Sequence, residues 1–450
     1  MPDGRHSAAR GRDDRAGRHH RPLANGDRLE ELGTQIEQSA HPERVIRTRR
    51  PRARRTRRRA VRLTLIVGIT LVGLVVALVG GGYLYARYRF GQIPKINVAG
   101  ELPQISGQPF NILEVGSDSR AGLTGQVARQ TGASAGLVSG QRSDVVKIMH
   151  IDPAAGTITI VSIPRDTMVT LLANQRLYGQ FNRINVNYAD GPSLLAQTIT
   201  ANFGIPINHV IQVSFAGLIN AADAIGGVYL DFPYPAKDAY SGLKIPHAGC
   251  QLVTGFQALA VARSRHYQWF QGGVWHYDPT SDFGRIDRQN VFIRALISRA
   301  KHLYNPLTIN SFLSKIPQGI TLDSGFTLNE LIGLAVKFHS YNPANMLTYT
   351  LPTVPATISG LGDVLFAQEP QVQQLLVKIF GSSLLTPTNP PPNQQLQTPL
   401  PPKIAPTTTT TTIAPTSTTA TKGTTTTVRR TTPVNPTTAV PYFDPVPCSP

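Results

Sequence analysis

The residues best suited to chemistry gather in one stretch, residues 263–289, which also holds both tryptophans of the chain. Arg263 and Arg265 are two positions apart, so in an extended backbone both side chains point to one face. Arg285 and Gln289 are four positions apart, so on a helix they share a face. Guanidinium groups bind phosphate oxygens through paired hydrogen bonds. The stretch therefore predicts a site for a multiply charged phosphate beside a flat or apolar group.

Three further polar clusters lie where predicted strands begin or end. G-S-D-S-R follows a first strand, R-S-D precedes a second, and I-P-R-D follows a third. Ligands bind at strand ends in layered sheets, and Mg²⁺ prefers one or two carboxylates beside water and phosphate. Asp118 and Asp144 are the candidate metal ligands, and Arg142 and Arg165 add to the phosphate-binding set.

These residues also have structural interpretations. Exposed arginines most often form surface ion pairs, and Asp118 suits a turn or a helix N-cap. No single residue stands out as the general base. Asp118 and Asp166 are the two candidates to take a proton from an acceptor hydroxyl, but Asp166 is equally suited to orienting an arginine. The chain lacks the G-x-S-x-G motif of serine hydrolases, the phosphate-binding loop of nucleotidases and histidines at metal-ligand spacing.

The elements that must position these residues alternate between strands and helices over residues 109–381. The β-rich runs 144–152 and 157–163 are separated by P-A-A-G and predict a hairpin. Residues 191–204 begin near a proline and end at a glycine, the two boundary signals of a helix. A longer helix is expected over residues 282–300. Alternation of this kind favours an α/β fold, an α-β-α layered sandwich around a central mixed sheet.

Residues 63–86 form an uncharged, mostly apolar stretch, long enough to cross a bilayer core as a transmembrane helix rising ~1.5 Å per residue. The 62 residues before it hold 18 arginines and 8 acidic residues, against Arg87 and Arg89 just after it. The positive-inside rule therefore places the N-terminus in the cytoplasm and everything after residue 90 outside. A cleaved signal peptide is the alternative, but the length and the lack of an evident cleavage site favour an uncleaved anchor.

The flanking segments carry little apolar surface. Residues 1–62 are predicted to be disordered, with their arginines on anionic lipid rather than on nucleic acid. Residues 87–108 are predicted to be a connector, and the Thr/Pro-rich residues 382–450 a disordered tail open to O-glycosylation. Cys250 and Cys448 are the only cysteines of the chain, and a disulfide between them requires that both lie outside the membrane.

Five motifs follow one another along the chain: N-I-L-E-V-G-S-D-S-R, Q-R-S-D, V-S-I-P-R-D, V-A-R-S-R and D-F-G-R-I-D-R-Q. After one N-terminal anchor, this order resembles the LytR-CpsA-Psr family of cell-wall enzymes over residues 110–301, and the resemblance extends to about residue 380. It implies an α-β-α sandwich with a long apolar pocket for a lipid tail. It also implies an extracytoplasmic phosphotransferase that moves a glycopolymer from a polyprenyl-pyrophosphate carrier to a peptidoglycan hydroxyl, leaving a phosphodiester link.

The resemblance also assigns roles to single residues. It makes Asp118 and Asp144 ligands of Mg²⁺, with Mn²⁺ as an alternative ion. The implied partners are the lipid-linked glycan, the peptidoglycan acceptor and membrane lipid, and nucleic acid is not expected. The implied catalytic residues are Asp118, Arg165, Arg263 and Arg265. The implied pyrophosphate-binding residues are Arg142, Arg165, Arg263, Arg265, Arg285 and Gln289.

Two features depart from the family pattern. Glu114 occupies an apolar-looking strand position, where it either faces solvent or pairs with an arginine. The aromatic insert of residues 266–281 either lines the acceptor or lipid groove or is an ordinary packed loop. Two other functions compete with the transferase: hydrolysis of the same carrier with water as the acceptor, and a non-catalytic envelope regulator whose basic tail binds nucleic acid.

Overall fold

The computed structural model describes residues 53–104, 107–118, 123, 128–129, 143–300, 306–393 and 441–449. The chain forms two compact units, Met1–Ala77 and Leu78–Pro450. The long helix α2 (Ala53–Phe90) runs through the boundary between them. Of the described helices, it alone is long and apolar enough to cross a membrane, over Arg58–Phe90. The predicted transmembrane segment, residues 63–86, lies inside this range.

The second unit is built on a seven-stranded mixed sheet with the order β1-β14-β7-β2-β3-β4-β15. The β2–β3, β3–β4 and β14–β7 pairs are antiparallel, whereas β1–β14, β2–β7 and β4–β15 are parallel. The β3–β4 pair confirms the predicted hairpin. The strands are β1 (Lys95–Ile96), β2 (Phe110–Ser117), β3 (Ser143–Asp152), β4 (Thr157–Ile163), β7 (His209–Ser214), β14 (Ile320–Asp323) and β15 (Leu347–Thr350).

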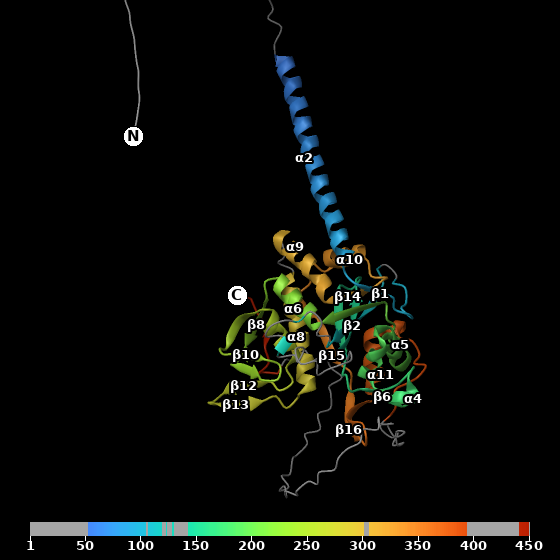
Figure 1. Ribbon diagram of the computed structural model, residues 1–450. Coiled ribbons are helices and arrows are strands. Elements are labelled where there is room, and N and C mark those ends of the chain that lie inside the picture. The colour runs from blue at the N-terminus through green and yellow to red at the C-terminus, as the bar shows by residue number, and fades with distance from the viewer. Residues whose placement is uncertain are drawn as a thin grey trace, which may run out of the picture. The chain divides into compact units, whose positions relative to one another are not determined.

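Helices cover both faces of this sheet, which confirms the α-β-α sandwich (Figure 1). On one face, α5 (Pro192–Phe203) and α11 (Gln371–Phe380) bury the alternate apolar residues of β2, β3 and β4. Helix α5 starts at its predicted proline and ends at Gly204, whose φ of 70° suits glycine. On the other face lie α6 (Phe215–Ala224), α7 (Gly255–Arg263), α8 (Asp282–Ala300) and α10 (Leu328–Lys337).

Smaller sheets and short helices complete the unit. One sheet has the order β10-β9-β12-β13 and another β11-β8-β18, and β16–β17 and β5–β6 are separate pairs. Their strands are β5 (Met168–Thr170), β6 (Phe181–Arg183), β8 (Val228–Phe232), β9 (Ala236–Asp238), β10 (Leu243–Ile245), β11 (Gly249–Val253), β12 (Gln268–Gln271), β13 (Val274–Tyr277), β16 (Thr353–Ile358), β17 (Gly362–Ala367) and β18 (Val446–Pro447). The remaining helices are α4 (Gln175–Tyr178), η2 (Ile184–Asp190), α9 (Pro306–Lys315), η3 (Ile316–Gln318), η4 (Pro343–Asn345) and η5 (Gly381–Ser383).

The ends of the predicted catalytic domain need correction. The predicted connector contributes β1 to the sheet, because Lys95 pairs with Leu322 on β14. The first residues of the predicted tail also pack on the domain, where the Leu385 amide donates to the Gly204 carbonyl at 2.8 Å. The last described residues, 441–449, do so as well. Residues 394–440 lie outside the described part of the chain, as do residues 1–52.

The segment 441–449 is held by a covalent bond and by buried side chains. Cys448 forms a disulfide with Cys250 of β11, and β18 pairs with β8. Phe443 stacks on Trp269, and Oδ1 of Asp444 lies 2.7 Å from Nη1 of Arg288, with both side chains buried. The prediction of disorder from the Thr/Pro composition is therefore wrong for residues 441–449, because a disulfide, a stacked aromatic ring and a buried ion pair hold them to the domain.

Candidate active site

The strand ends that carry the polar motifs meet at one edge of the central sheet, and β3 is bulged there. Gly116 pairs with Val145 but Ser117 pairs with Ser143, so Asp144 is an extra residue in β3. Bulges of this kind redirect a side chain and often occur beside active sites. A β-carbon at Gly116 would lie only 2.6 Å from the β-carbon of Val145. The bulge therefore requires glycine at its partner position.

Asp144 forms ion pairs with two arginines. Its Oδ1 lies 2.5 Å from Nη1 of Arg165 and 3.8 Å from Nη1 of Arg285. Arg285 also donates from Nη2 to the backbone carbonyl of Asp144, at 2.8 Å. Burial alone would raise the pKa of Asp144, but the charges of Arg285 and Arg165 outweigh it and lower that pKa. Asp144 therefore stays ionised in the folded protein.

Asp282, which the sequence analysis did not single out, holds the arginine cluster together. Its Oδ1 lies 3.0 Å from Nη2 of Arg285, 3.1 Å from Nε of Arg265 and 3.9 Å from Nε of Arg165. Asp282 is the first residue of α8, where the helix dipole favours a negative charge. The only feature of the sequence that indicated this role was the spacing of three residues between Asp282 and Arg285, which places both on one helix face. These contacts order three guanidinium groups before any ligand binds.

Arg263 reaches the site from a helix rather than from an extended segment. It is the last residue of α7, so the prediction that Arg263 and Arg265 share a strand face is wrong. Its guanidinium lies over the Phe215 ring, with 4.8 Å between the guanidinium carbon and the ring centroid. The apolar helical pattern of α7 extends to Arg263, and the chain then turns. The two arginines nevertheless line the same pocket.

The turn after α7 is fixed by Asp238, another residue that sequence reasoning missed. Its Oδ2 accepts hydrogen bonds from the Ser264 hydroxyl at 2.7 Å and from the Arg265 and His266 amides at 3.0 Å each. Burial would raise the pKa of Asp238, but these hydrogen bonds outweigh it and lower the pKa. Asp238 comes from a distant β-strand, so only the folded structure reveals this role.

Gln289 and Arg285 do lie on one face of α8, as their spacing predicted, and both line the pocket. Gln289 is buried, and its Nε2 donates to the Ala262 carbonyl at 3.0 Å. This bond joins α8 to α7. Gln289 therefore positions the two helices that carry Arg263 and Arg285, whatever further contact it makes with a ligand.

The two predicted metal ligands lie on adjacent strands. Asp118 directly follows β2 and is half-buried, and the Ser117–Ser143 pair places it beside the start of β3, near Asp144. No cluster of three or more His, Cys, Asp or Glu placed to hold a metal occurs in the described residues. A two-carboxylate set still suits Mg²⁺, which keeps water and phosphate as its other ligands. Arg142 lies outside the described residues.

Asp166, the alternative base, is held by two arginines. Its Oδ2 lies 3.4 Å from Nε of Arg165, and its Oδ1 lies 3.3 Å from Nε of Arg183. Arg183 in turn donates to the carbonyls of Leu361 and Asp363, at 2.6 and 2.9 Å. This arrangement favours the arginine-orienting interpretation of Asp166.

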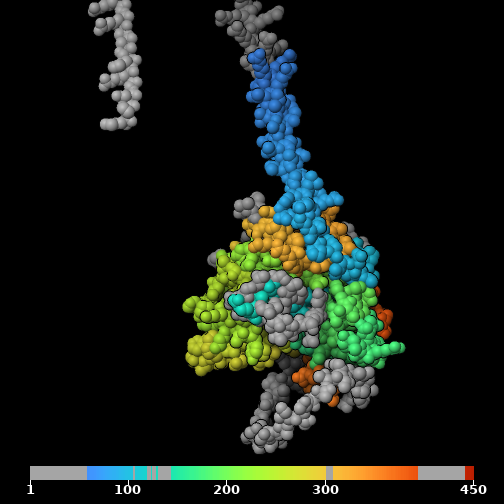
Figure 2. All heavy atoms as spheres, in the orientation of Figure 1, coloured from blue at the N-terminus to red at the C-terminus, as the bar shows by residue number. Residues whose placement is uncertain are grey.

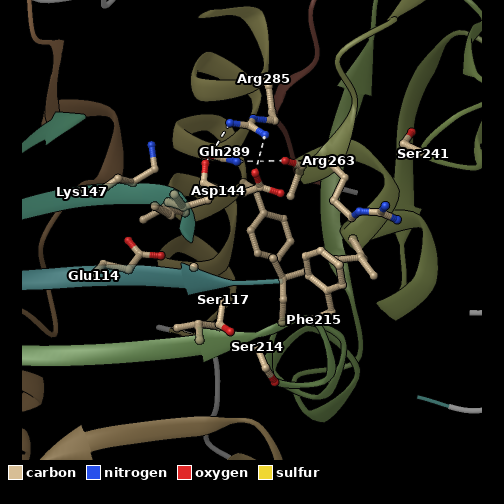
Figure 3. A pocket seen from close by; sticks show the side chains of 18 of the residues that line it. Glu114, Ser117, Asp144, Lys147, Ser214, Phe215, Ser241, Arg263, Arg285 and Gln289 are labelled. Atoms are coloured by element: carbon tan, nitrogen blue, oxygen red, sulfur yellow. Dashed lines mark hydrogen bonds and ion pairs between the residues drawn. The ribbon is translucent and has the colours of Figure 1, made fainter. Parts of the chain in front are cut away.

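A pocket of about 420 Å³ opens beside these groups, between the sheet and helices α6, α7 and α8. Arg263, Arg285 and Asp144 all line it, with Arg285 directly beside Asp144 (Figure 3). Apolar side chains from the helices and from β14 line much of its wall. These are Phe215, Leu218, Leu259, Phe292, Ile293, Leu296 and Ile320. A cationic cluster beside an apolar wall suits an amphiphile with an anionic head.

Glu114 lines this pocket, and the charge that acts on it is that of a lysine rather than of an arginine. Its cross-strand neighbour is Lys147, which is fully buried. Lys147 donates to the Asn290 side-chain oxygen at 2.6 Å and to the Ser162 hydroxyl at 2.9 Å. Burial raises the pKa of Glu114 and lowers that of Lys147 to about 8, and each charge opposes the shift of the other. Lys147 thereby ties β3, which bears Asp144, to α8.

The aromatic insert forms the β12–β13 hairpin, and its two tryptophans lie in different surroundings. Trp269 is 5% exposed and stacks on Phe443, so it belongs to the packed core. Trp275 is 40% exposed. From residues 266–281, only His266 lines the pocket, where its ring lies 4.4 Å from that of Tyr240. The hairpin itself therefore does not form the pocket wall.

Comparison with known proteins agrees with this fold. Residues 93–379 match the model of the LytR_cpsA_psr family, and the chain belongs to that family. The "LytR-Csp2A-Psr enzyme from Actinomyces oris" has a similar structure, with a TM-score of 0.51 and 23% sequence identity, over 66% of this chain and 97% of that one.

Two curated relatives are similar in sequence. The "Probable cell wall biosynthesis protein LcpB" of Corynebacterium glutamicum is 29% identical over 316 residues, 70% of this chain and 70% of the relative. The "Polyisoprenyl-teichoic acid--peptidoglycan teichoic acid transferase TagU" of Halalkalibacterium halodurans is 28% identical over 278 residues, 58% of this chain and 79% of the relative.

Proposed function

We propose that this protein is a membrane-anchored phosphotransferase that moves a glycopolymer from a polyprenyl-diphosphate carrier to a peptidoglycan hydroxyl. The observation that carries the proposal is the pocket, in which an arginine cluster adjoins an apolar wall. A diphosphate fits the cluster, and a prenyl chain fits the wall. The curated relative named as a teichoic acid transferase supports the same reaction class.

The arginines supply electrostatic stabilisation in this proposal. Phosphoryl transfer asks a protein mainly for positioning and for neutralisation of charge on the equatorial oxygens. Asp282 and Asp144 hold Arg165, Arg265 and Arg285 in place before the substrate arrives. A preorganised donor of this kind typically contributes about 3–4 kcal/mol to transition-state stability.

A divalent ion, Mg²⁺ or Mn²⁺, would be held by Asp118 and Asp144. Such an ion would neutralise charge on the diphosphate and so make its departing phosphate a better leaving group. Asp144 already contacts Arg165, so ion and guanidinium would share one carboxylate. Asp118 is the candidate to accept the proton of the acceptor hydroxyl, because Asp166 is held between Arg165 and Arg183.

The catalytic unit is proposed to face outward, with the N-terminus in the cytoplasm. Helix α2 supplies the candidate anchor, and arginines are concentrated before it. The Cys250–Cys448 disulfide supports the same orientation, because disulfides persist in oxidising compartments outside the cytoplasm.

The test uses the full-length protein in detergent, a polyprenyl-diphosphate donor with a labelled glycan, Mg²⁺ and purified peptidoglycan. We expect label to become covalently attached to sedimented peptidoglycan and to resist washing in hot detergent. Release of soluble glycan phosphate as the sole product, with peptidoglycan present, would instead identify a hydrolase. Omitting Mg²⁺ and adding a chelator tests the metal independently of the acceptor.

A further inference from the structure

The sheet β10-β9-β12-β13 has two faces of different composition. Residues that point inward are buried in the core, among them Ala236, Leu243, Ile245 and Trp269. The strand register aligns one outward row across all four strands: Lys244, Lys237, Gln268 and Tyr277. Phe270 and Trp275 form the next outward pair. Cross-strand partners point to the same face, so this outer face consists of two lysines, one glutamine and three aromatic residues.

The aromatic residues of the outer face are open to solvent. Phe270 is 38% exposed, Trp275 40% and Tyr277 63%. The rings of Phe270 and Trp275 lie 5.3 Å apart, and the ammonium of Lys237 lies 3.8 Å from the centroid of Trp275. Figure 2 shows this hairpin, in yellow-green, at the lower edge of the visible face, where no other element covers it. Exposed aromatic groups gathered on one face usually mark a binding surface.

The outer face begins beside the mouth of the pocket. Tyr240 and His266 both line the pocket, and their rings lie 4.4 Å apart. Tyr240 belongs to the turn between β9 and β10, and His266 lies two residues before β12. Four residues of extended chain, about 13 Å, separate His266 from Phe270. A chain attached to a diphosphate in the arginine cluster would thus leave the pocket past these two rings and reach the outer face.

The chemistry of the outer face fits a charged saccharide. Aromatic faces carry negative charge density and are apolar, so they pack against the C–H groups of a sugar ring. The two lysines would pair with phosphate or carboxylate groups along the chain, and the six outward side chains include no acidic residue. We propose that the outer face of the sheet β10-β9-β12-β13 binds the anionic saccharide chain of the donor as it leaves the pocket. This inference rests on the proposed function for the identity of the donor.

Binding is measured first, without the reaction. Lipid-free wall teichoic acid, a phosphate-linked glycan, is titrated into the full-length protein in detergent by calorimetry. We expect the double variant Trp275→Ala/Tyr277→Ala and the double variant Lys237→Ala/Lys244→Ala each to bind at least tenfold more weakly than the wild type. Trp275→Phe keeps an aromatic face and is expected to stay within threefold. Lys378→Ala is the matched control, because Lys378 lies 5.5 Å from a tyrosine ring on another part of the domain.

Competing occupants give different results. Inorganic polyphosphate supplies charge without sugar rings, and vesicles of anionic lipid supply a membrane surface. If either ligand loses as much affinity as teichoic acid in the Trp275→Ala/Tyr277→Ala variant, the face is not a saccharide site. Unchanged binding of teichoic acid in both double variants would also overturn the proposal. Thermal melting of each variant confirms that its fold is intact.

Transfer assays then separate this proposal from the proposed function. The outer-face variants should raise KM at least fivefold for a donor with a long glycan and leave kcat and KM unchanged for a donor with a single sugar. Equal effects on both donors would overturn the outer-face proposal while leaving the transferase intact. If the wild type transfers neither donor, the proposed function fails, and the calorimetry still decides whether the face binds saccharide.

Discussion

Trp269 and Phe443 stack face to face, with ring centroids 4.0 Å apart and an interplanar angle of 3°. Trp269 comes from the aromatic insert next to the arginine motif, and Phe443 from the last described segment of the chain. Phe443 is 8% exposed and belongs to the core under the sheet β10-β9-β12-β13. The far C-terminus therefore supports the sheet at the pocket mouth from beneath.

Replacing Phe443 tests this support. Phe443→Ala is expected to lower the free energy of unfolding by about 3–5 kcal/mol, the usual cost of truncating a buried phenylalanine. Tyr442→Ala is the control, since Tyr442 is 66% exposed and its loss should cost much less. Urea denaturation of the purified full-length protein measures both. Equal stability of the two variants would mean that the packing of Phe443 contributes little to the stability of the domain.

Arg263 is expected to act in the reaction rather than in folding. Arg263→Ala should lower kcat/KM about 100- to 1,000-fold, the scale of losing one preorganised donor to a developing charge. Arg299→Ala is the matched control, because Arg299 also lies over an aromatic ring, that of Tyr229 at 5.2 Å, but does not line the pocket. Transfer rates and melting curves are compared for both. A similar loss of activity in the two variants would contradict a role for Arg263 at the diphosphate.

The Glu114–Lys147 pair is expected to behave as a unit. Lys147→Met removes the counter-charge of the half-buried Glu114 and leaves Ser162 and Asn290 without their buried donor, which should cost about 1–3 kcal/mol. The double variant Glu114→Leu/Lys147→Met removes both charges and should recover much of that stability. A double-mutant cycle by chemical denaturation measures the coupling. Additive effects of the two single variants would show that the charges do not interact.

Glu101 predicts a dependence of stability on pH. Burial, and then the charge of Asp323, raise the pKa of Glu101 from 4.5 to about 7, while His209 opposes the shift. Between these values the folded form holds a proton that the unfolded form has lost. Stability from this group is therefore lost as the pH rises from 4.5 through 7. Melting temperatures of the wild type and Glu101→Gln should converge as the pH falls below 4.5, where Glu101 is protonated in both the folded and the unfolded chain. The same offset at every pH would contradict the assignment.

Local signals in the sequence predicted much of the fold. The β3–β4 hairpin follows from two β-rich runs around P-A-A-G, and the ends of α5 follow from Pro192 and Gly204. The alternation of strands and helices predicted a layered α/β or α-β-α domain, and the family resemblance specified the sandwich. The hairpin and the helix ends depend on short-range backbone preferences, which a single sequence records directly.

Features that depend on distant contacts were not predictable in the same way. Asp238 binds groups that the fold brings to it, and nothing in its neighbours distinguishes it from a surface acid. For Asp282, the spacing from Arg285 was the only local signal, and its contacts with Arg165 and Arg265 depend on the fold. The two-residue spacing of Arg263 and Arg265 implied one face only for a strand, whereas α7 ends between them. The bulge at Asp144 was not predicted either, because it depends on how β3 pairs with β2.

The disulfide between Cys250 and Cys448 changes how the Thr/Pro-rich stretch is connected. Asn389 donates from its amide to the Ala201 carbonyl at 2.9 Å, so the domain also holds the chain just before that stretch. The described residues on both sides of the stretch are thus attached to the same unit of the protein. A single proteolytic cut within the stretch would release no fragment until the disulfide was reduced. A cut there would therefore leave Phe443 and Asp444 in place beneath the pocket mouth.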